Sequence, residues 1–340
     1  MKKVVFIEVL RIVACFLVIV NHTNSDIFMF TAPSATWYVS LTYYFISKMA
    51  VPIFVMISGY TLLDKQDDYK KSGKRVLRMV LTLVIFSVVA YTYQYMKGTW
   101  AVFSIVECFK MMFQYPLSLA YWYLYMYIGL LIMMPFLQKF VTKLNKKDCE
   151  IFILASLFVY GAYPIIEHIW PQVTYTRLID LAIFDSYIGL LMAGYYMKKY
   201  VTPSTKKRIA AILVFVLSLA FNVLMTRREY ALYGPANFLF FDNRVLLPTL
   251  LEGISFFYIV MHIPWKGKIT NVLTLVGGCT FGIFLVSDII IDKFRFVFTD
   301  LCNKGLYPVL SVIVFEILVF VIGFVITFVM KKIPFLKKLL

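Results

Sequence analysis

The stretch VVFIEVLRIVACFLVIVNH (residues 4–22) is apolar over most of its length, yet it carries Glu8, Arg11 and, at its end, His22. A charge inside the hydrocarbon of a bilayer is costly, so an arginine in such a stretch is a candidate functional residue. From Arg11 to His22 a helix makes about three turns and rises about 16 Å. Both side chains are therefore expected on one face of a membrane helix, with Arg11 inside a hydrocarbon core about 30 Å thick and His22 near its far boundary.

A secretory signal peptide is the alternative interpretation of this N-terminal stretch. Glu8 and Arg11 interrupt the apolar region, and no small-residue cleavage site follows it. We therefore expect a membrane helix that is retained in the protein.

The composition predicts an integral membrane protein, because 61% of the 340 residues are hydrophobic and only 15% are charged. Apolar stretches of about twenty residues are typical of membrane helices. Ten such stretches are apparent, at 4–26, 37–63, 76–96, 119–139, 150–170, 179–197, 208–226, 244–263, 271–292 and 308–330. We expect an all-α protein with about ten transmembrane helices in a single domain over residues 1–340, without a soluble domain. Residues 101–115 are expected to form an interfacial helix with Glu107 and Lys110 on its wet side.

The net charge of +16 raises the question of a nucleic-acid partner. Most lysines and arginines, however, lie in loops that alternate along the chain, around residues 65–78, 139–147, 198–208 and 331–338. Basic residues concentrate in the cytoplasmic loops of membrane proteins. The charge therefore predicts a topology with both termini in the cytoplasm, and membrane lipid, not nucleic acid, as the surrounding partner.

Metal and nucleotide chemistry have no support in the sequence. The five cysteines are scattered and never spaced as C-x-x-C, and the three histidines are far apart, so no metal site is expected. No glycine-rich phosphate-binding motif is present.

A second group of candidate functional residues lies in the segment VPIFVMISGY (residues 51–60) and in the basic run after it. The basic run consists of Lys70, Lys71, Lys74, Arg75 and Arg78. Pro52 predicts a kink, and Ser58 followed by Gly59 permits close helix packing. Arg75 and Arg78 stand three residues apart at the start of the third predicted span, where two guanidinium groups can bind one phosphorylated ligand. The alternatives are tight packing alone for Ser58 and a solvated cytoplasmic loop for the basic run.

These segments together resemble the membrane acyltransferase 3 family. The resemblance is carried by Glu8–Arg11 with ten residues between Arg11 and His22, by Val51–Tyr60, by Lys74–Arg78, by Tyr121–Leu124 leading to Pro135, by Leu190–Tyr195 and by Gly278–Leu285. They occur in the right order over nearly the whole chain. The chain departs from the family pattern at the ninth span, where Ser287, followed by Asp288, stands in place of a common histidine.

The resemblance implies acetyl-CoA as the acyl donor on the cytoplasmic side and a hydroxyl of a glycan or glycolipid as the acceptor, in a bacterial plasma membrane. It makes Arg11 and His22 functional, with Glu8 beside them, and assigns Arg75 and Arg78 to the donor. We add Lys74, Ser58 and Tyr60 to the expected donor-binding set. Trp122 and Tyr123 are candidate substrate contacts, or else part of an aromatic belt at the membrane interface.

Acyl transfer fits these residue types. Imidazole is suited to removing a proton from a hydroxyl near neutral pH, so His22 is the candidate general base, or else a transient acyl carrier. Arg11 is a candidate for stabilising developing negative charge, or else forms a structural ion pair with Glu8.

The competing function is a proton-coupled transporter or glycolipid flippase, because intramembrane charges also build proton relays. A membrane scaffold or sensor without chemistry is a third possibility. Six further charged residues within the predicted spans are expected to face the bundle interior: Lys48, Asp180, Asp185, Glu252, Asp288 and Glu316. The residues indicate neither the oligomeric state nor the identity of the acceptor.

Overall fold

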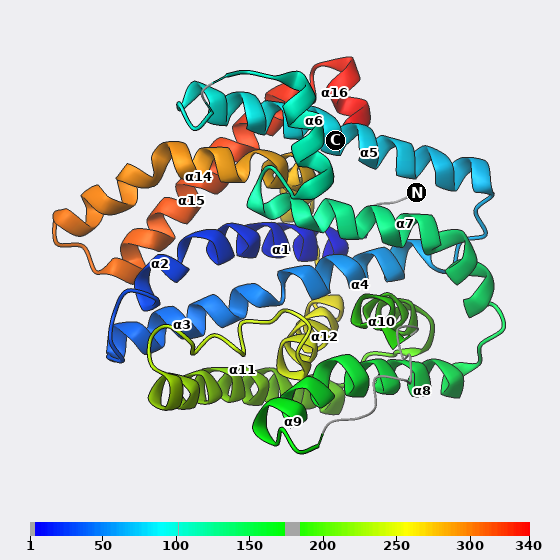
Figure 1. Cartoon of the computed structure of the whole chain (residues 1–340). Coiled ribbons are helices and arrows are strands. Elements are labelled where there is room, and N and C mark those ends of the chain that lie inside the picture. The colour runs from blue at the N-terminus through cyan, green and yellow to red at the C-terminus, as the bar shows by residue number, and fades with distance from the viewer. Residues whose placement is uncertain (1–3, 101, 174–183) are drawn as a thin grey trace. The chain divides into compact units, whose positions relative to one another are not determined.

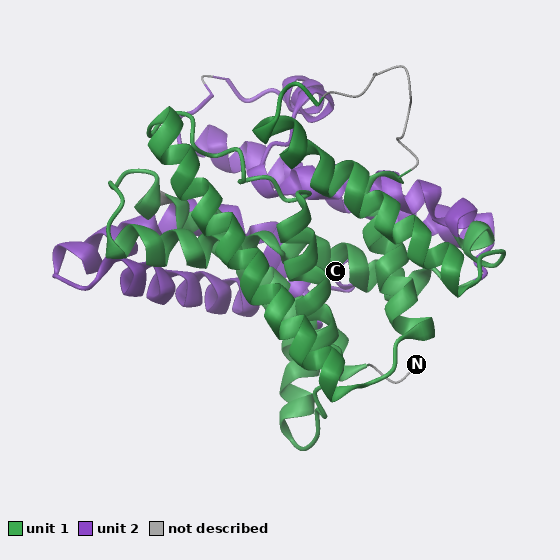
Figure 2. Ribbon diagram, turned by 90° about the horizontal axis from the view of Figure 1, so that it is seen from below, with its two compact units in different colours: residues 1–65, 138–277 green, residues 66–137, 278–340 purple. Residues whose placement is uncertain are grey.

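The computed structural model describes residues 4–100, 102–173 and 184–340, and these residues form helices joined by loops and turns (Figure 1). The chain divides into two compact units, residues 1–65 with 138–277 and residues 66–137 with 278–340 (Figure 2). Predicted Asp180 lies outside the described residues.

Unit 1 contains eleven helical elements within its described residues. They are α1 (Val5–Thr23), α2 (Ser25–Phe28), α3 (Ala35–Lys48), α4 (Ala50–Leu62), α8 (Lys146–Ser156), the π-helical η2 (Leu157–Ala162), α9 (Tyr163–Ile169), α10 (Ser186–Tyr200), α11 (Thr205–Tyr233), α12 (Leu247–Met261) and α13 (Ile269–Gly277).

Unit 2 contains the remaining elements of the described chain. They are α5 (Tyr69–Met96), α6 (Ile105–Gln114), the short 3-10 helix η1 (Leu119–Tyr121), α7 (Trp122–Val141, whose last turn is counted with unit 1), α14 (Thr280–Asn303), α15 (Pro308–Met330) and α16 (Pro334–Leu339).

The membrane character expected from the composition is confirmed, but the count of ten spans is not. Among the described residues, seven helical segments are long and apolar enough to cross a membrane, and α13 with α14 makes an eighth if the two form one broken span. Every predicted stretch coincides with helix where it is described. However, α10 and α12 have only 15 residues each, fewer than the roughly 20 that span a bilayer unaided. The cytoplasmic position of the termini stays a prediction.

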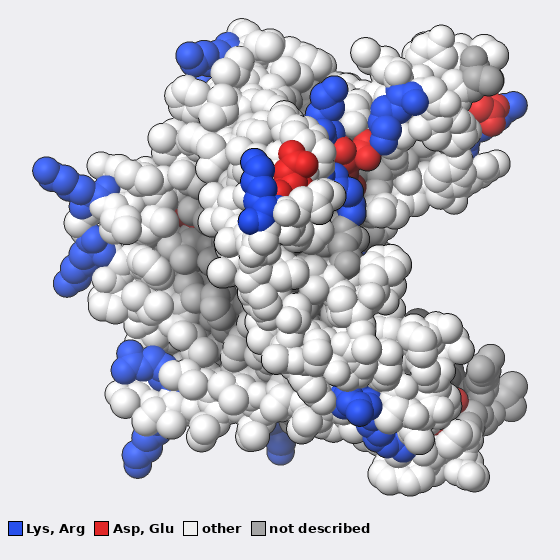
Figure 3. All heavy atoms as spheres, turned by 90° about the vertical axis from the view of Figure 1, so that its left-hand side faces the viewer, with Lys and Arg blue, Asp and Glu red and all other residues white. Residues whose placement is uncertain are grey.

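Charged side chains are sparse on the face drawn in Figure 3, where uncharged residues make up most of the surface and Lys and Arg are the more prominent charged groups. This distribution agrees with the low charged fraction and positive net charge of the chain. Surfaces of this kind suit an apolar environment.

Helix α1 lies in the interior of unit 1, in contact with α3, α4, α12 and α13. Its side chains Leu10, Ala14, Cys15, Ile19 and Val20 are almost completely buried. Because α1 is covered by protein on several sides, its buried acid Glu8 faces protein neighbours, which is the environment that tolerates charges in a membrane helix.

The second predicted span is interrupted between α3 and α4, at Met49. Pro52 has no backbone N–H to donate to the carbonyl of Lys48, four residues earlier, so the hydrogen-bond ladder is broken at this point. A helix break therefore lies three residues before Pro52, close to where the kink was expected. Gly253 of α12 packs against Pro52, because a Cβ atom at Gly253 would lie 2.6 Å from the proline Cβ.

Two glycines bring α4 and α10 into backbone contact. A Cβ atom at Gly59 would lie 2.0 Å from the carbonyl oxygen of Leu191, and one at Gly194 would lie 2.1 Å from the carbonyl oxygen of Met56. Any larger side chain at either position would force the helices apart. The close packing expected of Gly59 is therefore confirmed, and two of the segments quoted in the family resemblance lie against each other.

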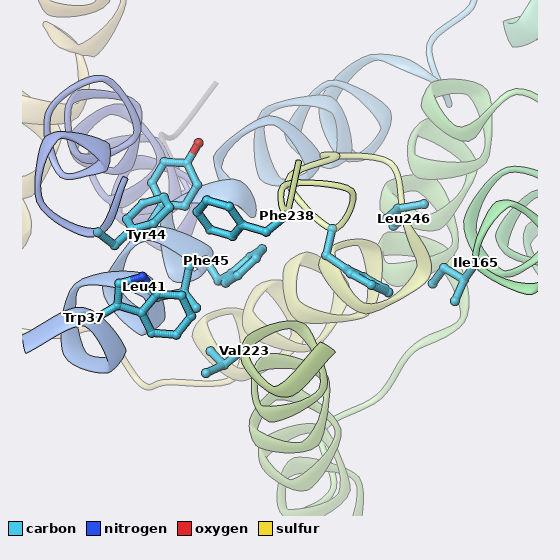
Figure 4. Close-up of a cluster of buried hydrophobic side chains, with 10 residues drawn as sticks. Trp37, Leu41, Tyr44, Phe45, Ile165, Val223, Phe238 and Leu246 are labelled. Atoms are coloured by element: carbon cyan, nitrogen blue, oxygen red, sulfur yellow. The ribbon is translucent and has the colours of Figure 1, made fainter. Parts of the chain in front are cut away.

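The segment 234–246, between α11 and α12, is buried although it is not helical. Phe238, Phe241 and Leu246 of this segment have almost no exposed surface and belong to one buried cluster with Trp37 and Leu41 of α3. Phe238 lies on the Trp37 side of this cluster, and Leu246 lies beside Ile165 (Figure 4). Non-helical backbone within a membrane protein is tolerated where protein covers it.

A buried ion pair fixes this segment to α3. Lys48 pairs with Asp242, and the hydroxyl of Tyr44 donates to Asp242 over 3.0 Å. Two of the predicted intramembrane charges, Lys48 and Asp185, therefore have structural partners, since Asp185 accepts from the backbone N–H of Tyr187 at the start of α10.

Asp288 has a structural role in unit 2. Its carboxylate accepts from the hydroxyl of Ser118 and, over 3.0 Å, from the backbone N–H of Ala120, at the beginning of η1 and α7. An acid is stabilising where helix N–H groups lack partners. Asp288, which follows the departure from the family pattern at Ser287, thus anchors the start of α7 on α14.

Residues 105–114 form the amphipathic helix α6, as expected for this part of the chain. Glu107 and Lys110 lie on its exposed face, whereas Cys108 and Met112 pack near Tyr91 of α5. Burial raises the pKa of the Cys108 thiol, so this cysteine stays protonated and serves as a packing residue.

Candidate active site

Arg11 and His22 lie on one continuous helix, as expected, since α1 extends from Val5 to Thr23. Both side chains are half-buried. The spacing of eleven residues places them on the same helix face.

Arg11 donates to the carboxylate of Glu8 over a distance of 3.1 Å. The Glu8 side chain is 4% exposed, whereas that of Arg11 is 37% exposed. Glu8 packs closely on α13, because a Cβ atom at Gly277 would lie 2.4 Å from Glu8 Oε2 and 3.1 Å from its Cα. Glu8 is thus the buried, fixed member of the pair, and it orients an arginine that still has accessible surface.

The end of α1 that carries His22 is anchored to α3. The side-chain amide of Asn24 donates to the carbonyl of Ser40 over 2.6 Å, and the Ser40 hydroxyl lies 3.3 Å from Asn24 Oδ1. Both residues are fully buried. Two residues after His22, the backbone is therefore held in one place, which restricts the positions that the imidazole can reach.

The second arginine site lies at the start of α5 in unit 2. The carboxylate of Asp67, 1% exposed, pairs with Arg75 and lies 2.5 Å from Lys71 Nζ. Arg78 and Lys74 are exposed on the same turns of the helix. Arg75 is thereby fixed by an acid, while Arg78 presents its guanidinium group outward.

The basic run is helical and does not form a loop. Helix α5 already begins at Tyr69, where the Asp68 side chain accepts from the backbone N–H of Lys71 over 2.7 Å. Sequence analysis missed both acids. The available signals were a capping aspartate before a helix and an acid four residues before Lys71.

Ser58 and Tyr60, expected near the donor, make contacts within unit 1. The Ser58 hydroxyl donates to the carbonyl of Phe54 over 3.2 Å. The Tyr60 ring lies 5.3 Å from Phe6 of α1 and 6.0 Å from Phe257 of α12, measured between ring centroids. These contacts bring the α4 segment to the first helix.

Trp122 and Tyr123 begin α7 in unit 2 and are half-buried. Tyr123 stacks on Tyr127 with ring centroids 5.7 Å apart, and its edge meets Phe284 of α14 at 6.0 Å. The rings thus form an aromatic ladder along α7.

The acyltransferase domain family model matches residues 4–331, which include every candidate site residue described above. The chain belongs to the acyltransferase 3 family. No curated protein and no solved structure matches the chain. The family and the apolar helices together make this protein a multi-pass membrane acyltransferase.

The other two histidines of this acyltransferase have structural partners. His168 Nε2 lies 2.9 Å from the fully buried carboxylate of Glu229, and its ring stacks on Phe240 at 3.6 Å. His262 Nδ1 lies 2.8 Å from the carbonyl of Tyr258.

A buried carboxylate lies in the interior of unit 1. Glu252 of α12 accepts from the side-chain amide of Asn222 of α11 over 2.9 Å, and both residues are completely buried. No group of three or more potential metal ligands occurs among the described residues.

Proposed function

We propose that this membrane acyltransferase is an O-acetyltransferase that moves an acetyl group from cytoplasmic acetyl-CoA to a hydroxyl of a cell-surface glycan or lipid-linked saccharide in a bacterial plasma membrane. The main support is α1, a protein-covered helix that carries an imidazole and an acid-oriented arginine on one face. Family membership supports acyl transfer, and the residue types support transfer to a hydroxyl.

In the proposed reaction, the acceptor oxygen attacks the thioester carbonyl, a C–O bond forms, and the C–S bond breaks. His22 takes the proton from the hydroxyl and passes it to the departing CoA thiolate, so no net proton is gained or lost. Alternatively, His22 carries the acetyl group briefly on a ring nitrogen and then transfers it to the acceptor.

Arg11 is assigned to the negative charge that develops on the thioester carbonyl oxygen. A fixed cation acts more strongly in a low-dielectric surrounding than in water, and Glu8 holds the guanidinium group without reorganisation during the reaction. Glu8 is thus a positioning residue.

The phosphates of acetyl-CoA are assigned to Arg75 and Arg78, with Lys74 as an additional cation. Guanidinium groups bind phosphate through two parallel hydrogen bonds, which an ammonium group cannot provide. Arg78 and Lys74 have exposed side chains, and Asp67 keeps Arg75 extended on the same helix. Trp122 and Tyr123 offer ring faces to a sugar or to the donor.

The test uses inverted membrane vesicles that contain the full chain, with radiolabelled acetyl-CoA as donor and the endogenous glycan fraction as acceptor. We expect label in the glycan fraction, and a loss of about 10²- to 10⁴-fold in rate with His22→Ala. His262→Ala is the matched control, because His262 also ends a helix but bonds to a backbone carbonyl. Equal rates for the two variants would contradict the role of His22.

The same vesicles separate the enzyme from a transporter. A proton-coupled transporter or flippase would move its solute without incorporation of acetyl label. Acid-quenched samples lacking acceptor distinguish the two catalytic routes: an acetylated peptide containing residue 22 indicates an acyl carrier, and an unmodified one indicates a general base.

A further inference from the structure

The buried carboxyl group of Glu252 is a titratable group that the proposed reaction does not use. It lies on α12, which packs beside α11 within unit 1 (Figure 1). Glu252 and Asn222 of α11 are both completely buried, and the side-chain amide of Asn222 donates to Glu252 Oε1 over 2.9 Å. An acid and an amide thus join the two helices in the interior of the unit.

Two oxygen atoms of this contact are unsatisfied. Glu252 Oε2 and Asn222 Oδ1 are buried and have no hydrogen-bond partner among the described residues. Both are acceptors while the carboxyl group is ionised, so neither can serve the other. A buried polar atom without a partner costs free energy, and these two atoms belong to planar groups that already meet through their other atoms.

Among the described residues, no cation balances a charge on Glu252. Helices α1, α3, α4, α10 and η2 also pack against α12, yet the Asn222 amide is the one group of the described chain that acts on the Glu252 carboxyl group besides burial. The charged groups on these helices and on α11 include three cations with acids of their own: Lys48 with Asp242, Arg11 with Glu8, and Arg228 with Glu229. A buried carboxylate without a countercharge is costly, and such a group takes up a proton instead.

A proton on Glu252 Oε2 removes both defects at once. The Oε2–H group becomes a donor, Asn222 Oδ1 is its acceptor, and the acid and the amide then exchange two hydrogen bonds. A water molecule would donate to both oxygens but would leave the charge uncompensated. A metal ion would need several more oxygen ligands than these two atoms provide.

We infer that Glu252 is a protonated acid in the folded protein at neutral pH, and that its reciprocal pair with Asn222 locks α12 to α11. Helix α12 also packs against α4, where Gly253 contacts Pro52, so the lock holds a helix that supports the centre of unit 1. Loss of the proton would leave a bare charge in this packing, and the lock would open as the solution becomes alkaline. The inference does not depend on acetyl transfer.

The first test compares the melting temperatures of the purified full-length protein and its Glu252→Gln variant in detergent, between about pH 6 and about pH 8. Glutamine keeps the size and both hydrogen bonds of the protonated acid but does not titrate. The unfolded chain releases the Glu252 proton in its ordinary acidic range, whereas the folded chain keeps it, so rising pH favours unfolding of the unmodified protein. Relative to the variant, its unfolding equilibrium constant should increase about tenfold per pH unit, and the variant should melt increasingly above it.

Glu8→Gln is the matched control for this measurement. Glu8 is also a buried acid of unit 1, with 4% of its side chain exposed, but it pairs with Arg11, which stays charged over this range. Its variant should differ from the unmodified protein by the same amount at each pH. A difference for Glu252→Gln that is equally independent of pH would overturn the inference.

Infrared spectroscopy detects the proton directly. The difference spectrum between the unmodified protein and the Glu252→Gln variant at neutral pH should contain the C=O band of a protonated carboxylic acid. Asn222→Ala removes the partner of the acid, so it should shift this band to a higher wavenumber, which a merely structural role of Asn222 would not do. A carboxylate band in place of the acid band would overturn the inference, and a melting temperature that then rises with sodium concentration would assign the two oxygens to a bound cation.

Discussion

The two arginine sites are each built around a buried carboxylate, but they use it differently. On α1, Glu8 precedes Arg11 by three residues within one apolar helix, and the acid faces α13. At the start of α5, Asp67 lies before the helix and holds two cations, Arg75 and Lys71, while Arg78 stays exposed. The first arrangement fixes a single charge inside the protein, as suits stabilisation of a reacting group. The second fixes one cation and presents others, as suits binding of a polyanion.

The largest difference between the two sites is expected from removal of Arg11. Arg11→Ala takes away a charge proposed to act on the transition state, so the turnover number should fall by about 10²- to 10³-fold with little change in the KM for acetyl-CoA. Steady-state acetyl transfer in vesicles measures both constants. A rise in KM alone would show that Arg11 binds the donor. The two arginine sites would then not differ in function.

Arg78→Ala should show the opposite pattern. Loss of a charge-assisted hydrogen bond to phosphate raises the KM for acetyl-CoA by about tenfold and leaves the turnover number within about twofold. Inhibition by CoA and by 3′-dephospho-CoA shows whether Arg78 contacts the 3′-phosphate. If it does, the Arg78→Ala variant should bind the two inhibitors equally well, whereas the unmodified protein should prefer CoA. An unchanged KM would contradict a role for Arg78 in donor binding.

Smaller effects are expected from substitution of the two acids, Glu8 and Asp67. Glu8→Gln keeps the size of the side chain but releases Arg11, so we expect a loss of about tenfold in turnover number. Asp67→Asn releases Arg75 and should raise the KM for acetyl-CoA by only about threefold, because Arg78 and Lys74 remain. If both substitutions changed the same kinetic constant, the two carboxylates would not serve different steps.

The smallest effect is expected for Lys71→Ala. Its ammonium group is the more exposed partner of Asp67, with 59% of the side chain accessible, and exposed ion pairs contribute about 0–1 kcal/mol. Transfer rate and melting temperature should both stay close to those of the unmodified protein. A tenfold loss of activity would instead place Lys71 among the donor-binding residues.

Periodicity and composition were sufficient to predict much of this fold. Long apolar stretches, the helix break before Pro52, close packing at Gly59 and the amphipathic helix over 105–114 all follow from local sequence, because each depends on neighbouring residues along the chain. The ion pair of Glu8 with Arg11 was accessible for the same reason, at a separation of three residues.

Features that depend on tertiary contacts were not accessible in this way. Lys48 was expected to face the bundle interior, but its pairing with Asp242 joins residues almost two hundred positions apart. The role of Asp67 was missed because an acid within a predicted basic loop looks like ordinary solvated charge. Asp288 likewise meets Ser118 only through the packing of α14 beside η1.

The glycine contacts between α4 and α10 constrain how unit 1 can move. With the carbonyls of Leu191 and Met56 seated where side chains would otherwise stand, neither helix can rotate or slide without a backbone collision. The two helices α4 and α10 must therefore move together as one rigid body. An opening that admits a substrate to unit 1 therefore requires movement of other segments, such as the break at Met49 or the non-helical stretch before α12. The contact between α4 and α10 stays closed during this movement.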